Sequence, residues 1–172
     1  MNRPSRDSYT SRNIFARLVA SSLSRALRSM LALLCLVATS SLAEVMPMVA
    51  AAPGGGDAAS AYTVALKSDG TVMAWGDNAY GQLGVDTTTR SLIPVMVPGV
   101  TGVVAVSVGD AHTFALKSDG TVMAWGTGLL GNGTSSQRSS PVTVPGLTGA
   151  VAVAAGGTHT VALKSDGTVM AW

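Results

Sequence analysis

A repeated 13-residue segment constrains this chain more than any other feature of its sequence. Residues 63–75 read Thr-Val-Ala-Leu-Lys-Ser-Asp-Gly-Thr-Val-Met-Ala-Trp, and the same string returns at residues 160–172. Residues 113–125 repeat it with Phe114 in place of the first valine. The tryptophans that end the three copies are 50 and 47 residues apart, a period typical of propellers and solenoids. The sequence therefore predicts an array of similar structural units.

Each copy has the pattern of a β-hairpin. Residues 68–71, Ser-Asp-Gly-Thr, favour a turn because Asp and Gly tolerate positive φ angles. A two-residue loop would pair Leu66 with Met73 and place the bulky side chains, Trp75 among them, on one face of the hairpin. The alanines would then face a neighbouring sheet. A three-residue loop would shift the pairing by one residue, and the sequence is compatible with both registers.

Two shorter segments complete the secondary-structure prediction. Residues 103–108 and 151–155 are short apolar runs that precede Gly109 and Gly156, and they predict further strands. Beyond residue 56 no stretch of 11 residues has helical periodicity. This part of the chain is therefore predicted to be all-β.

Charge and glycine divide the chain into two parts. Residues 1–52 hold six arginines against two acidic residues, whereas residues 53–172 hold five basic residues against seven aspartates. All 20 glycines lie at or after Gly54. The net charge of +2 is thus a property of the N-terminal part. The acidic remainder argues against binding to nucleic acid, which requires a basic surface.

The N-terminal part has the organisation of an export signal. Its arginines precede an apolar run at residues 30–38 and small residues up to Ala43, the order found in secretory signal peptides. We expect a helical signal peptide at residues 1–43 and a secreted, periplasmic or cell-surface protein. The alternative is an uncleaved signal anchor that extends to residue 52. Residues 44–59, rich in Gly and Ala, are predicted to be a linker.

Further motifs surround the hairpins. Residues 106–112 read Val-Ser-Val-Gly-Asp-Ala-His, and residues 75–84 read Trp-Gly-Asp-Asn-Ala-Tyr-Gly-Gln-Leu-Gly. Together with the hairpins they resemble the regulator of chromosome condensation repeat, in its bacterial exported branch. That resemblance covers residues 60–172 and implies a seven-bladed β-propeller, of which this chain would hold two to two and a half four-stranded blades. The expected units are 60–110, 111–157 and a truncated 158–172.

Two positions depart from the family pattern. Tyr62 stands where the later units have His112 and His159, and the second unit shortens the loop after its tryptophan to Gly-Leu-Leu-Gly at residues 128–131. Because propellers close with typically four to eight blades, we expect a fragment of a longer propeller. Such a fragment is also expected to associate with other repeats.

No residue forms a recognisable catalytic, cofactor-binding or metal-binding motif, so we expect neither enzymatic activity nor a cofactor. The two histidines share one repeat position and are each predicted to satisfy a buried backbone group within their own blade. The repeated aspartates are predicted to stabilise turns, with a lysine two residues away as balanced, solvated charge. The tryptophans are predicted to anchor the core. These aspartates and tryptophans are Asp69, Asp119, Asp166, Trp75, Trp125 and Trp172.

The leading hypothesis for function is an exported scaffold that binds an unidentified protein or cell-surface partner. Its variable loops at residues 77–90 and 127–140 would make the contact, because loops on a rigid scaffold usually carry binding. We expect no nucleic-acid binding, and no membrane contact once the signal is removed. Two alternatives remain: guanine-nucleotide exchange, as the family name implies, and a fragment of a larger propeller enzyme.

Overall fold

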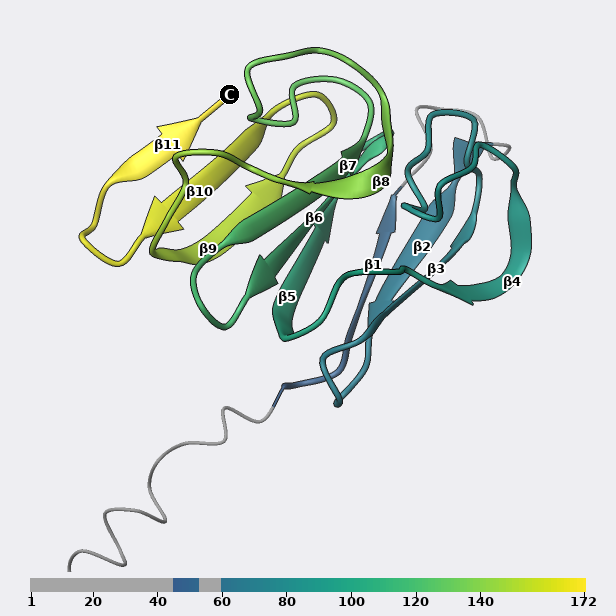
Figure 1. Ribbon diagram of the computed structural model, residues 1–172, viewed down its shortest axis with the longest axis horizontal. Helices are drawn as coiled ribbons and strands as arrows, with labels where there is room; N and C mark the ends of the chain where they lie inside the picture. Colours follow the sequence, from purple (N-terminus) through teal and green to yellow (C-terminus); the bar gives the residue numbers. More distant parts are fainter. Residues whose placement is uncertain (1–44, 53–59) are drawn as a thin grey trace, which may run out of the picture. The chain divides into compact units, whose positions relative to one another are not determined.

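The computed structural model describes residues 45–52 and 60–172, and these residues form eleven strands in three antiparallel sheets (Figure 1). The expected signal peptide at residues 1–43 lies outside the described residues. Within the described ranges, no helix has the length and apolar character needed to cross a membrane. The all-β prediction for the repeat region is confirmed.

The strands follow the chain order within each sheet. The first sheet contains β1 (Met48–Ala52), β2 (Tyr62–Leu66), β3 (Val72–Gly76) and β4 (Ser91–Met96). The second sheet contains β5 (Val103–Val108), β6 (His112–Lys117), β7 (Val122–Gly126) and β8 (Arg138–Thr143). The third sheet contains β9 (Ala150–Ala155), β10 (Thr160–Lys164) and β11 (Val169–Ala171).

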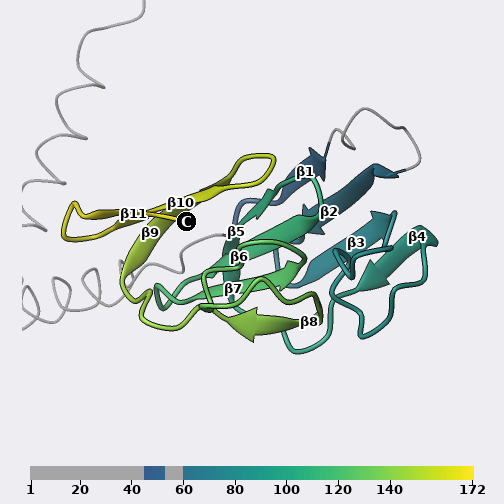
Figure 2. The ribbon, with the colours of Figure 1, turned by 90° about the horizontal axis from the view of Figure 1, so that it is seen from above.

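The three sheets are arranged as consecutive blades of a partial β-propeller. The first strands of the sheets are neighbours, because β5 contacts both β1 and β9. The last strands, β4 and β8, lie on the outer side of their sheets (Figure 2). Sheets stacked face to face around such a set of inner strands are the architecture of propeller blades.

The blades do not coincide with the units expected from the sequence. The strand at 103–108 falls at the end of the expected unit 60–110, but as β5 it pairs with β6 of the following hairpin. In the same way β1 pairs with β2 along its whole length, from Met48 opposite Leu66 to Ala52 opposite Tyr62. Residues 48–52 of the expected linker are therefore the first strand of a blade, because they pair with β2 and bury Ala52 in the first apolar cluster.

The hairpins adopt the shifted register. Leu66 lies opposite Val72, and the loop of three residues between Lys67 and Thr71 is closed by a bond from Lys67 N–H to the Thr71 carbonyl, 2.9 Å long. Gly70 ends the turn with φ +77°, as a three-residue hairpin loop with a glycine bulge requires. The other two hairpins keep this register.

This register separates the bulky residues that a two-residue loop would have placed together. Val64 and Leu66 share their face with Val72 and are buried, whereas Met73 and Trp75 point to the opposite face. Of the two registers that the sequence left open, the one that grouped Leu66 with Met73 and Trp75 is therefore excluded, because one extra loop residue inverts the faces of the second strand.

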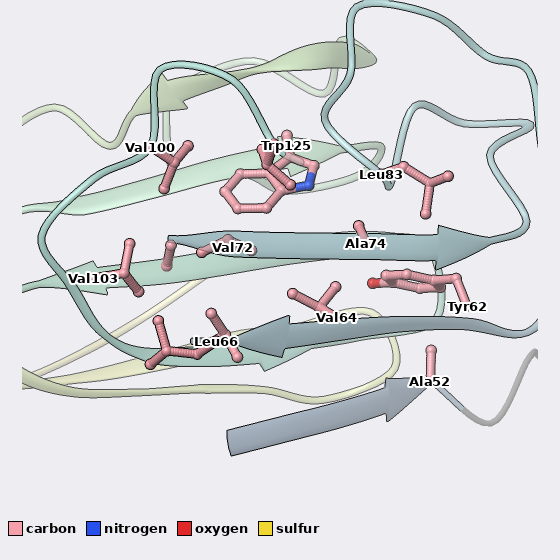
Figure 3. Close-up of a cluster of buried hydrophobic side chains, with 13 residues drawn as sticks. Ala52, Tyr62, Val64, Leu66, Val72, Ala74, Leu83, Val100, Val103 and Trp125 are labelled. Carbon is pink, nitrogen blue, oxygen red and sulfur yellow. The ribbon is translucent and has the colours of Figure 1, made fainter. Parts of the chain in front are cut away.

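Two apolar clusters hold the sheets together. The first lies between the first and second sheets, where side chains of β2 and β3 meet the indole of Trp125 from β7 (Figure 3). The second lies between the second and third sheets and includes Phe114, Leu116 and Ala162. The second sheet therefore buries both of its faces, which explains why five consecutive residues of β6, from His112 to Leu116, are buried.

Candidate partner-binding surface

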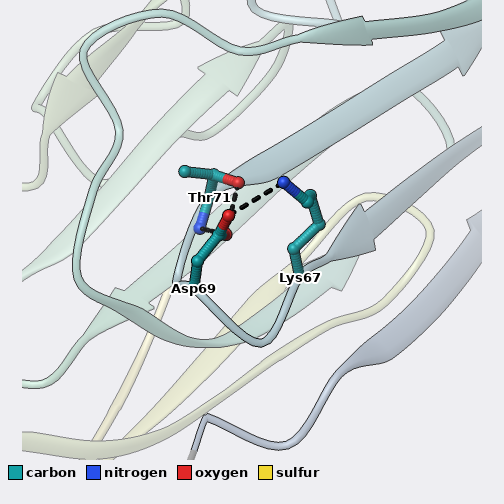
Figure 4. Close-up of polar contacts among 3 residues, drawn as sticks. All are labelled: Lys67, Asp69 and Thr71. Carbon is teal, nitrogen blue, oxygen red and sulfur yellow. Dashed lines mark hydrogen bonds and ion pairs between the residues drawn. The ribbon is translucent and has the colours of Figure 1, made fainter.

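The hairpin turns are stabilised by their aspartates, as the sequence predicted. Asp69 Oδ1 accepts hydrogen bonds from Thr71 N, at 3.0 Å, and from Thr71 Oγ1, at 2.6 Å. Lys67 Nζ donates to Asp69 Oδ2 at 2.8 Å (Figure 4). The Lys67 ammonium and the Thr71 donors together hold the pKa of Asp69 well below its usual range.

The second and third turns repeat this arrangement. Thr121 Oγ1 and N–H both donate to Asp119 Oδ1, and these bonds lower the pKa of Asp119 to about 2. Thr168 donors lower the pKa of Asp166 in the same way. Because the carboxylates serve separate, exposed turns, they are not placed to act as an acid–base pair.

A buried polar network crosses the interface between the first and second sheets. Trp125 Nε1 donates to the backbone carbonyl of Gln82 at 2.9 Å, and Thr113 Oγ1 donates to the same oxygen at 2.9 Å. Tyr62 OH donates to the backbone carbonyl of His112 at 2.7 Å and lies 3.1 Å from Thr113 Oγ1. Burial raises the pKa of Tyr62 well above its usual value. The phenol therefore acts as a neutral structural donor.

The equivalent positions at the second interface lack these bonds. His112 Nε2, Thr160 Oγ1 and Trp172 Nε1 are buried and have no hydrogen-bond partner among the described residues. They occupy the repeat positions of Tyr62, Thr113 and Trp125. The second interface therefore buries the same three positions with less hydrogen bonding.

The loop at residues 77–90 is built around two buried amide side chains. Asn78 Nδ2 donates to the carbonyls of Thr87 and Thr89, at 2.8 and 3.0 Å, while its Oδ1 accepts from Leu83 N–H. Gln82 Nε2 donates to Asp77 Oδ2 at 2.8 Å, and its Oε1 accepts from the Tyr80 N–H. Buried amides that make several bonds fix a loop in one conformation.

This loop is also joined to the second sheet. Asp86 N–H donates to the Ser139 carbonyl at 2.9 Å, and Ser140 Oγ donates to Asp86 Oδ1 at 2.8 Å. Asp86 has φ +61°, a left-handed conformation that is uncommon outside glycine. Its two hydrogen bonds to β8 hold Asp86 in that conformation. Through these bonds the loop of the first blade contacts the second blade.

Exposed apolar side chains lie next to the 77–90 loop. On β4, Leu92 is 84% exposed, Ile93 69% and Met96 62%. Tyr80 is exposed on the loop itself. We call these four residues the β4 patch. Pro94 has no backbone N–H, so it interrupts the row of backbone hydrogen-bond donors along this outer strand. It therefore opposes edge-to-edge pairing with another sheet.

The corresponding surface of the second blade is polar. Ser139, Ser140 and Thr143 of β8 occupy the repeat positions of Leu92, Ile93 and Met96. In the shorter loop at residues 127–140, Leu129 is exposed, and Asn132 Oδ1 accepts from Thr134 N–H at 3.1 Å. The apolar character of the β4 patch is therefore specific to the first blade.

Comparison with known proteins identifies the repeats. The regulator of chromosome condensation (RCC1) repeat matches residues 69–116 and 119–163, and a second form of the same repeat matches residues 103–133. The chain belongs to the regulator of chromosome condensation repeat family. The first two matched segments begin and end within hairpins and therefore span parts of consecutive blades.

Solved structures, yeast RCC1 among them, have a similar fold. Human WBSCR16 is 26% identical with a TM-score of 0.59, over 64% of this chain and 30% of that protein. Yeast RCC1 (Prp20) bound to Kap60 is 25% identical with a TM-score of 0.54, over 64% of this chain and 27% of that protein. Prp20p from Saccharomyces cerevisiae, studied with its binding to Gsp1p and histones, is 26% identical with a TM-score of 0.55, over 64% of this chain and 28% of that protein. This chain thus spans about 30% or less of these relatives.

The two histidines differ in environment, and the prediction that each satisfies a buried backbone group is wrong for His112, whose buried Nε2 has no hydrogen-bond partner among the described residues. His112 is buried, its ring meets Phe114 edge-on at 5.6 Å, and burial lowers its pKa. His159 is exposed because residues 150–172 form the outermost described sheet of this repeat array. In residues 45–52 and 60–172, no three His, Cys, Asp or Glu side chains come together as a metal site.

Sequence reasoning found the 77–90 loop but missed the apolar strand beside it. The signal was present in the repeat alignment, where Leu92 and Ile93 face two serines in the second unit. The expectation that tryptophans anchor the core is met by Trp125, which is fully buried. Trp172 packs on the second cluster, whereas Trp75 lies outside both clusters that the described residues form.

Proposed function

We propose that this chain is an exported, non-catalytic scaffold that binds a protein through the β4 patch and the adjoining 77–90 loop. The observation that carries the proposal is the exposure of Leu92, Ile93 and Met96 on one strand, whose counterpart in the next blade is polar. Exposed apolar patches of this kind on a soluble fold mark interaction sites. Aromatic and Met side chains are also enriched in protein interfaces, as in Tyr80 and Met96 here.

The rigidity of the loop supports binding by a preformed surface. Asn78 and Gln82 are fully buried, and Asp86 ties the loop to β8. A surface that is fixed before binding loses less conformational entropy when a partner docks. The yeast relatives support proteins as the class of partner, since Kap60, Gsp1p and histones are the molecules named with them.

Export is part of the proposal and rests on the arginine-rich leader. Cleavage after Ala43 would remove none of the described strands, because β1 begins at Met48. The pairing of residues 48–52 with β2 favours cleavage over an anchor that extends to residue 52. N-terminal sequencing of the protein from the extracytoplasmic fraction should begin at Glu44. Recovery of intact protein only with the cytoplasm would refute export.

The binding proposal is tested by giving the first blade the polar residues of the second. The triple variant Leu92→Ser, Ile93→Ser, Met96→Thr keeps the strand length and Pro94. Affinity capture from the native cells should recover a partner with the unmodified chain and lose it with the triple variant. The control, Val151→Ser, changes an exposed valine of the third sheet and should retain the partner. Equal recovery with all three proteins would refute a role for the β4 patch.

A further inference from the structure

The outward face of the first sheet repeats a surface that is already buried elsewhere in the protein. The registers of β1, β2 and β3 place six side chains on this face, which we call the N-terminal outer face: Val49, Ala51, Thr63, Ala65, Met73 and Trp75. In the second sheet five of the six equivalent side chains are identical and Val108 takes the place of Ala51, and these residues pack against the first sheet: Val106, Val108, Thr113, Ala115, Met123 and Trp125. Val49 is 67% exposed, whereas Val106 is buried.

The outward face of the third sheet repeats the other side of that interface. Val161, Leu163, Val169 and Ala171 share this face, which we call the C-terminal outer face. The identical set in the first sheet packs against the second sheet and is buried: Val64, Leu66, Val72 and Ala74. On the third sheet the same residue types are accessible, and Val169 is 61% exposed.

We propose that the N-terminal outer face of one copy of this chain packs against the C-terminal outer face of a second copy. The contact is head to tail and repeats the packing of the second sheet on the first. Because the described residues expose one face of each kind, the contact propagates into rings or open chains. It goes beyond the proposed function, since it does not use the 77–90 loop; of the β4 patch only Met96, which lies opposite Met73, borders the N-terminal outer face.

The chemistry of the two faces supports this pairing. None of the ten side chains is ionisable, so their burial incurs no desolvation of charge. Nearly all of them are apolar, and their association removes this surface from water. In the internal interface Trp125 lies over β3 beside Val72 and Ala74 (Figure 3). The equivalent contact places Trp75 of one copy over β11 of the next.

Two exposed valines allow the contact to be blocked at either end without disturbing the core. Val49→Glu places a charge on the N-terminal outer face, and Val169→Glu places one on the C-terminal outer face. A carboxylate buried in an apolar contact without a partner should weaken association by about a hundredfold or more. Leu92→Glu, on the 84% exposed Leu92 of β4, is the matched control.

Sedimentation velocity of the full 172-residue chain over a range of concentrations is the test. The unmodified chain and Leu92→Glu should form species larger than a monomer, and Val49→Glu and Val169→Glu should each remain monomeric. An equimolar mixture of the two blocked variants should form a dimer, because each supplies the face that the other lacks.

Three results would overturn the proposal. The first is a monomeric unmodified chain at all concentrations, which would assign the faces to repeats of another protein. The second is association of both blocked variants as strongly as the unmodified chain. The third is a mixture that stays monomeric although circular dichroism shows both variants folded. If either variant is unfolded, the pair Ala65→Glu and Leu163→Glu blocks the same faces and is judged by the same results.

Discussion

The indole N–H of Trp125 donates to the backbone carbonyl of Gln82 at 2.9 Å and so joins the second blade to the loop of the first. The Gln82 side chain turns back to Asp77 within its own loop. One residue therefore organises both the blade interface and the conformation of the 77–90 loop. Stability of the interface and shape of the candidate binding surface are coupled through it.

Removal of the buried indole should destabilise the protein far more than removal of its repeat equivalent. Trp125→Ala removes a fully buried side chain and its hydrogen bond, and should lower the free energy of unfolding by about 3–5 kcal/mol. Trp75→Ala removes a half-buried tryptophan outside both clusters. It should lower the free energy of unfolding by clearly less than Trp125→Ala does. Urea unfolding followed by circular dichroism measures both. Equal losses would contradict the assignment of Trp125 as the interface anchor.

Gly84 is required by the same tryptophan. A Cβ atom at Gly84 would lie 2.8 Å from Cδ1 and Nε1 of Trp125, and the residue has φ +70°. Placing an alanine in the left-handed conformation costs ~1–2 kcal/mol by itself. Gly84→Ala should therefore lower the free energy of unfolding by more than this amount, and should also shift the fluorescence of Trp125.

Gly99 provides a matched control for this substitution. It has φ +71°, and a Cβ atom there would meet nothing within 4 Å. Gly99→Ala should cost only the backbone contribution, about 1–2 kcal/mol. If the two variants unfold at the same urea concentration, steric contact with Trp125 is not the reason for glycine at position 84.

The hairpins show which parts of this fold a sequence predicts and which it does not. Repetition, turn chemistry and apolar runs were sufficient to predict strands at 103–108 and 151–155 and an all-β array. The register was not determined, because Ser-Asp-Gly fits loops of two or three residues and only the main-chain bond from Lys67 to Thr71 distinguishes them. The shift by one residue then decides whether Trp75 faces inward or outward.

The candidate surface was predictable only in part. The 77–90 loop was found because the units differ there, but β4 was not, since Leu92 and Ile93 beside Pro94 have no alternating pattern. Strand β1 was also missed, because an alanine-rich stretch before three glycines is typical of a linker. Its pairing with β2 depends on tertiary packing, which overrides such local preferences.

His112 makes the second interface sensitive to pH. Burial lowers its pKa below the ordinary value of about 6.5, so folding favours the neutral ring. The stabilisation is fully present above about pH 6.5 and is lost as the pH falls from there towards the lowered pKa. The free energy of unfolding should therefore decrease as the pH falls below about 6.5.

His112→Tyr should remove this dependence and strengthen the interface. Tyr62, at the equivalent position, donates its hydroxyl to the carbonyl of His112 in the next sheet, so the introduced phenol should donate to the carbonyl of His159. We expect a gain of about 1 kcal/mol at neutral pH, measured by urea unfolding at several pH values. A variant that is less stable than the unmodified chain, or that keeps its pH dependence, would contradict this role.

The conformation of the 77–90 loop should depend on Asn78. Asn78→Ala removes two donated bonds and one accepted bond and leaves the carbonyls of Thr87 and Thr89 without that donor. It also leaves the buried N–H of Leu83 without its acceptor. An unsatisfied buried donor costs about 1–3 kcal/mol, so amides across the loop should exchange with solvent about tenfold faster or more. The control Asn132→Ala removes an exposed acceptor of the shorter loop and should leave exchange at 77–90 unchanged. Hydrogen exchange measured by mass spectrometry resolves both loops, and unchanged protection in Asn78→Ala would show that Gln82 alone maintains the surface.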